Sequence, residues 1–93
     1  MTTMQKTLQF LIDNICADFT VDSLLGTARG CLAAGPCTTA NISTAIRRKD
    51  PSLDKGCADG LAEGVVNALA ELDGVTVRDA TVYPAADRPS RAY

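Results

Sequence analysis

The residues best suited to recognition or catalysis form a polar stripe in the segment 57–73. Asp59, Glu63, Asn67 and Glu71 recur every four residues, a spacing that puts side chains on one face of a helix. Acid–base catalysis by carboxylates usually needs a pair with different pKa values, and the acids here are scattered singly. The sequence contains no histidine, the usual general base near neutral pH. We therefore expect no catalytic residue and no enzyme activity.

The cysteines are the second candidate for site chemistry. Cys16, Cys31, Cys37 and Cys57 are separated by fourteen, five and nineteen residues. Structural zinc sites usually take close ligand pairs such as C-x-x-C, so this spacing does not favour metal. We expect reduced, buried thiols that pack as small apolar side chains, with no metal and no cofactor. A metal site and a reactive thiol are the alternatives.

Length and composition indicate one soluble globular domain over residues 1–93. Hydrophobic residues make up 46% of the chain and charged residues 22%, which is typical of such proteins. The formal net charge of −2 argues against capture of nucleic acid or anionic membrane by overall charge. No apolar stretch is long enough to span a membrane, and the N-terminal segment lacks the pattern of a signal peptide. We expect a cytoplasmic protein without membrane contact.

Hydrophobic periodicity predicts a mainly α fold with a small β element. Four helices are expected, over residues 4–17, 20–34, 39–50 and 57–73. Thr20 and either Thr38 or Thr39 are the expected N-caps of the second and third. The alternating residues of VTVRDATVY predict a strand that begins near Val75. Residues 84–93 would form a loop and tail, or return through SRAY as a short antiparallel strand.

The inward-facing apolar residues of these elements are expected to share one core. They are Leu24, Ile42, Ile46, Leu61, Val65, Leu69, Leu72 and Val77. Phe10 lies off the apolar stripe of the first helix, so it either widens the buried face or meets a partner.

Over residues 20–83 the pattern resembles a winged helix-turn-helix domain. A helix ends in AAGPCTT, which could supply a first strand, and the helix TANISTAIRRKD follows. GLAEGVVNALAELDGV then runs into the alternating residues of a wing. The resemblance implies that segment 57–73 is the third helix, which usually enters the DNA major groove in that family, and that residues 1–19 are an added helix. The alternative is a plain four-helix domain with a C-terminal strand.

The charge on the expected third helix conflicts with DNA reading. DNA-binding proteins gain much of their affinity by neutralising phosphates with lysine and arginine, and the polar stripe carries neither. Binding to DNA would depend on the nearby basic residues, which are Arg47, Arg48, Lys49, Lys55 and Arg78. The run from position 47 to 49 equally fits a solvated helix end, where it complements the helix dipole.

Two classes of function fit these observations. The favoured hypothesis is a protein-binding module, monomeric or dimeric, that regulates or inhibits a larger partner. It would use the polar stripe, with Arg47, Arg48, Lys49 and Arg78 as further contacts. In size, charge and lack of catalytic residues the chain is similar in type to small phage-encoded inhibitors, anti-CRISPR proteins among them. The alternative is a sequence-specific DNA-binding transcriptional regulator of the winged-helix type.

Overall fold

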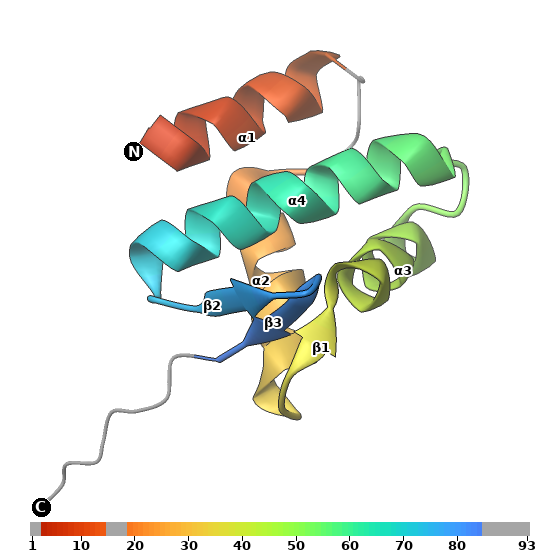
Figure 1. Cartoon of the computed structure of the whole chain (residues 1–93). Helices are drawn as coiled ribbons and strands as arrows, with labels where there is room; N and C mark the ends of the chain where they lie inside the picture. The colour runs from red at the N-terminus through yellow and green to blue at the C-terminus, as the bar shows by residue number, and fades with distance from the viewer. Residues whose placement is uncertain (1–2, 15–18, 85–93) are drawn as a thin grey trace, which may run out of the picture.

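The computed structural model describes residues 3–14 and 19–84. It is mainly α with a small antiparallel sheet, as the sequence predicts (Figure 1). The elements are α1 (Thr3–Asn14), α2 (Val21–Ala33), β1 (Cys37–Thr38), α3 (Thr39–Lys49), α4 (Lys55–Leu72), β2 (Thr76–Arg78) and β3 (Thr81–Tyr83). The last three residues of the predicted helix 4–17 and the segment SRAY lie outside the described residues.

Side-chain caps fix where three of the helices begin. Thr20 accepts a hydrogen bond from the backbone N–H of Ser23 at 3.1 Å, and Ser23 Oγ accepts one from Thr20 N at 3.1 Å. Thr38 and Asn41 form the same reciprocal pair, with both distances at 3.0 Å. Each capping box satisfies N–H groups that have no partner inside the helix. Asp54 caps α4, so that helix begins two residues earlier than predicted.

A strand begins at Thr76, close to the predicted Val75, but the chain turns back within the predicted strand and forms a hairpin, which corrects the predicted position of the return strand. Strands β2 and β3 are joined by Asp79 and Ala80, whose φ angles are 51° and 64°. Two consecutive left-handed residues in a two-residue loop are the backbone of a type I′ turn. Strand β3 lies in the middle of the sheet, in the order β1-β3-β2. A return strand therefore precedes Pro84.

Helix α4 is the central element of the fold. In Figure 1, α1 lies along one side of α4, the hairpin lies on the opposite side, and α2 crosses behind α4. Helix α3 packs along α4 as well. The core of the protein therefore forms around α4 rather than between two equal layers.

Six of the eight predicted core residues are buried, and two are not. The buried six are Leu24, Ile42, Ile46, Leu61, Val65 and Leu69. Leu72 is 38% exposed because it ends α4, where the chain turns away toward the hairpin. Val77 is 44% exposed because it lies on an edge strand. Its partner in register, Val82, occupies the central strand and is fully buried.

The first helix contributes to the same core. Leu8 and Ile12 of α1 are buried against α4. Phe10 is 65% exposed, so it does not widen the buried face of α1. An isolated exposed aromatic side chain is common on protein surfaces.

Candidate functional site

The polar stripe of α4 does not stay on one face, in contrast to the sequence prediction. An α-helix turns by about 100° per residue, so each four-residue step advances by about 40°. From Asp59 to Glu71 the stripe therefore rotates by about 120° around α4. One end of the stripe reaches α3 and the other reaches α1, while Glu63 and Asn67 lie between them.

Asp59 is held by the neighbouring helix. The buried Ser43 of α3 donates a hydrogen bond from Oγ to Asp59 Oδ1 at 2.6 Å. Lys55 Nζ lies 2.9 Å from Asp59 Oδ2. The Ser43 hydrogen bond first, and then the Lys55 contact, lower the pKa of the Asp59 carboxyl below its ordinary value. Asp59 is therefore an internal contact between α3 and α4, and Lys55 is its counter-ion.

Glu71, at the other end of the stripe, faces the beginning of α1. The backbone N–H of Met4 points to Glu71 Oε1, with a distance of 3.4 Å between nitrogen and oxygen. A carboxylate in this position faces the positive end of the α1 dipole and the unpaired N–H groups of its first turn. Glu71 therefore contributes to the attachment of α1.

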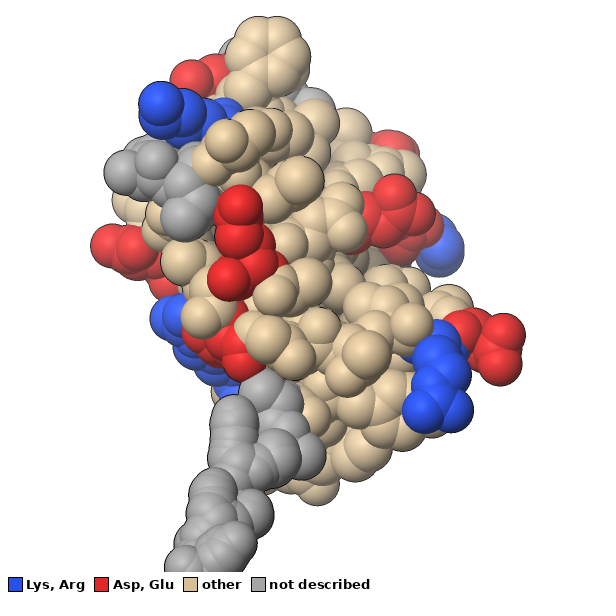
Figure 2. Space-filling model, turned by 60° about the vertical axis from the view of Figure 1, so that its left-hand side comes forward, with Lys and Arg blue, Asp and Glu red and all other residues tan. Residues whose placement is uncertain are grey.

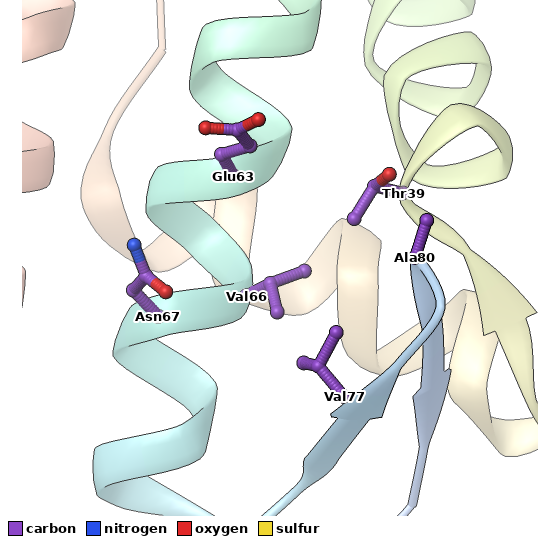
Figure 3. A pocket seen from close by; sticks show the side chains of 6 residues that line it. All are labelled: Thr39, Glu63, Val66, Asn67, Val77 and Ala80. Atoms are coloured by element: carbon purple, nitrogen blue, oxygen red, sulfur yellow. The ribbon is translucent and has the colours of Figure 1, made fainter.

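The middle of the stripe borders a hollow between α4 and the hairpin. The hollow has a volume of about 270 Å³ and is lined by Thr39, Glu63, Val66, Asn67, Val77 and Ala80. In Figure 3, Val66 of α4 and Val77 of β2 point toward each other across it, and Thr39 and Ala80 lie at one end. An adjoining hollow of about 200 Å³ shares Thr39 and Glu63 and extends past Asp59 to Lys55. Glu63 thus lies where the two hollows meet.

Glu63 and Asn67 are the open members of the stripe. Both are exposed, and within residues 3–14 and 19–84 neither side chain forms a hydrogen bond or an ion pair with the rest of the chain. The carboxylate of Glu63 and the amide of Asn67 therefore remain free for a partner.

The tip of the hairpin is fastened to the start of α3. The backbone N–H of Thr39 donates to the carbonyl oxygen of Ala80 at 3.1 Å. Ala80 holds a left-handed backbone in this position, which costs a residue with a side chain roughly 1–2 kcal/mol. The hairpin therefore lies against the body of the protein, and its tip closes one end of the hollow.

The predicted basic residues do not form one surface. Arg47, Arg48 and Lys49 are exposed on the last turn of α3. The Arg78 guanidinium lies over the Tyr83 ring, 5.7 Å from its centre, on the hairpin beside the start of α3. From its start to Arg47, α3 rises by about two turns, or about 12 Å. On the face drawn in Figure 2, basic side chains stand apart, with acidic and uncharged surface between them.

The described cysteines are free and partly buried. Cys31, Cys37 and Cys57 pack against the edge of the core, and Cys16 lies outside the described residues. Burial, and then the nearby Cys31, raise the pKa of the Cys37 thiol above its ordinary value. A raised pKa keeps a thiol protonated and unreactive. In the described part of the chain, no three His, Cys, Asp or Glu side chains are placed to hold a metal ion.

The residues that form the walls of the hollow are not predicted as a site by the sequence analysis. Val77 was expected in the core, Val66 had no assigned role, and Ala80 was expected inside a strand. The alternation around Val77 does carry a signal, since an apolar residue on an edge strand is left partly uncovered.

None of the helices in residues 3–14 and 19–84 is long and apolar enough to cross a membrane.

Comparison with protein families, with curated proteins and with solved structures gave no match to this chain. The winged-helix resemblance therefore stays a prediction, and the function is argued from the site alone.

Proposed function

We propose that this chain is a non-catalytic protein-binding module that regulates or inhibits a larger partner, and that the open middle of the α4 stripe contacts that partner. The alternative is DNA reading by α4. One observation carries the choice, which is the position of α1 along α4, on the side away from the hairpin (Figure 1).

The contact between α1 and α4 is close. A β-carbon at Gly64 would lie 3.1 Å from the Cδ1 atoms of both Leu8 and Leu11. Helices packed side by side have axes about 8–10 Å apart, so the pair is about 20 Å wide. The major groove is about 12 Å wide. With α1 packed beside it and Leu8 buried in the contact, α4 could approach the groove only together with α1, which would then lie against the DNA backbone.

Charge supports the same choice. The free carboxylate of Glu63 would face the phosphates, and Lys55 is already paired with Asp59. Among the other exposed cations, Arg47 to Lys49 lie on the last turn of α3, and Arg78 lies apart from them on the hairpin, over the Tyr83 ring. Against a basic protein surface the same carboxylate would speed association and select the partner.

A DNA titration tests the choice between the two functions. Wild type, Glu63→Lys and the double variant Arg47→Ala/Arg48→Ala are titrated against mixed-sequence duplex DNA at low salt. We expect no micromolar binding by wild type or the double variant. DNA reading would instead give salt-sensitive binding that the double variant loses and Glu63→Lys strengthens. That result would overturn the proposal.

A capture experiment tests the partner directly. The tagged protein is incubated with lysate, with and without nuclease, and we expect a protein partner that nuclease treatment does not remove. Glu63→Lys should lose the partner. Asp13→Lys, on α1 and outside the hollow, changes the net charge equally and should retain it. A partner lost on nuclease treatment, or retained by Glu63→Lys, contradicts the proposal.

A further inference from the structure

We propose that the hollow between α4 and the hairpin is a socket for an arginine side chain presented by the protein partner. This inference rests on the proposed function and names the group that the open stripe would recognise. It is carried by three observations: an apolar pair of walls, an unpaired carboxylate at the rim, and a hairpin tip that is fixed in place.

The walls fit the aliphatic part of a long side chain. Val66 and Val77 face each other across the hollow (Figure 3). Val66 is buried, whereas Val77 remains 44% exposed, so apolar surface on the hairpin side is still open to solvent. Arginine and lysine commonly cover such surface with their methylene groups while their charged end stays at the rim.

The rim selects a cation. Glu63 and Asn67 border the hollow on α4, and within the described residues no basic side chain lies within ion-pair distance of Glu63. An anion would be repelled by this carboxylate. An uncharged apolar side chain would bury the carboxylate without a partner, which is costly. The electrostatic complement of the site is therefore a positive charge.

Arginine fits the rim better than lysine. Its planar guanidinium can donate two parallel hydrogen bonds to the Glu63 carboxylate. Lysine presents a compact charge that cannot form the two parallel bonds. The adjoining carboxylate of Asp59 is already occupied by Ser43 and Lys55, so Glu63 is the acceptor.

The hairpin tip keeps the two walls at a fixed separation. The bond from Thr39 N to Ala80 O, 3.1 Å long, fastens the tip at the end of the hollow. A site whose walls are already in place loses less entropy when it is occupied. The left-handed backbone of Ala80 is consistent with such a role, since strained residues are often kept where they shape a binding site.

The test uses N-acetyl-arginine amide as the probe and backbone amide chemical shifts as the readout. We expect weak, saturable binding, with shifts confined to residues around Glu63, Asn67, Val77 and Ala80. The lysine analogue should bind more weakly and the uncharged norleucine analogue should not bind. Shifts that are absent, spread over the whole surface, or equally large with norleucine would overturn the proposal.

Matched variants locate the binding. Glu63→Gln should weaken the arginine probe by about tenfold, because one oxygen and the charge are lost. Asp13→Asn removes one charge outside the hollow and should bind as wild type does. Val77→Thr keeps the shape of the wall but adds a hydroxyl, and should also weaken binding. Equal affinity in Glu63→Gln and wild type would contradict the socket.

This experiment separates the socket from the proposed function. If the probe fails to bind while Glu63→Lys still abolishes capture of a nuclease-resistant partner, the socket is wrong and the protein-binding function stands. If the probe binds as described but no such partner is captured, the socket stands and the proposed function is wrong.

Discussion

The two flanks of α4 are covered by their neighbouring elements to different extents. On one flank α1 packs closely at Gly64, which faces the ends of Leu8 and Leu11, although a hollow of about 320 Å³ remains nearer the start of α4, beside Leu11 and Gly60. On the other flank the hairpin touches α3 at its tip and leaves a hollow beside Glu63 and Val77. The closed flank contributes stability, because it buries Leu8 completely and Leu11 in part. The open flank contributes less stability and is the one that offers unpaired polar groups.

Truncation of one apolar residue on each flank should show the largest difference. Leu8→Ala removes a fully buried side chain and should lower the free energy of unfolding by roughly 2–5 kcal/mol. Val77→Ala removes a side chain that is 44% exposed and should cost less than about 1 kcal/mol, since little burial is lost. Urea unfolding followed by circular dichroism measures both. Equal costs would mean that the flanks do not differ as described.

Two glycines of α4 test how tight the closed flank is. A β-carbon at Gly60 meets no atom within 4 Å, so Gly60→Ala should stabilise the protein by up to about 1 kcal/mol through helix propensity. The same change at Gly64 places a β-carbon 3.1 Å from two leucine methyl groups. We expect the gain there to be reduced or reversed by crowding. A larger gain at Gly64 than at Gly60 would contradict close packing by α1.

The strain on the open flank can be released by one substitution. Ala80→Gly should raise the free energy of unfolding by roughly 0.5–1 kcal/mol, because glycine adopts a positive φ without steric cost. Ala80 has a φ of 64°. The matched change Ala40→Gly, in the right-handed first turn of α3, should instead destabilise the protein. If Ala80→Gly destabilises to the same extent, the left-handed turn is not formed in solution.

The smallest expected effect concerns the end of α4 beside the open flank. Arg29 Nε lies 2.9 Å from Asp73 Oδ2, and this hydrogen bond is the main cause that lowers the pKa of Asp73. A carboxyl whose pKa is lowered by folding stabilises the protein at any pH above the ordinary carboxyl pKa. This stabilisation is lost below about pH 5, as the pH falls through the pKa of the folded state. The exposed pair should contribute about 0.2–1 kcal/mol.

Unfolding of wild type and Arg29→Gln at pH 7 and pH 3 measures this contribution. The difference in stability between the two proteins should be present at pH 7 and should shrink toward pH 3, because protonation of the Asp73 carboxyl removes the ion pair. The pH dependence that remains in Arg29→Gln includes Asp59, whose pKa is also lowered. A difference that grows at acid pH would contradict the pairing.

The helices were predictable because local rules fix them. Periodic leucines and isoleucines mark the inward faces, and Thr20 and Thr38 mark two of the starts. The hairpin was missed because its turn is Asp-Ala rather than a glycine-containing pair, so nothing in the sequence breaks the alternation. That two-residue turn sets the register of the hairpin, in which Val77 pairs with Val82.

The candidate site was only partly predictable. Periodicity correctly places Glu63 and Asn67 on the exposed part of α4. It does not reveal that Asp59 is bound by Ser43, which is sixteen residues away, or that Glu71 faces the start of α1. These contacts depend on which helices become neighbours in the fold. A four-residue spacing alone does not show which neighbouring helix each side chain of the stripe will reach as the stripe rotates around α4. The walls of the hollow come from segments joined only by tertiary contacts.

The bond from Thr39 to Ala80 also makes one backbone amide a reporter of local opening. The hairpin buries only Val82 fully, so it can separate from α3 at a lower free energy than global unfolding requires. Each such opening would expose the Thr39 amide to solvent hydrogen while the amides in the middle of α4 stay protected. The rate of hydrogen exchange at this amide would therefore report how often the hairpin separates from α3, even while the helices remain folded.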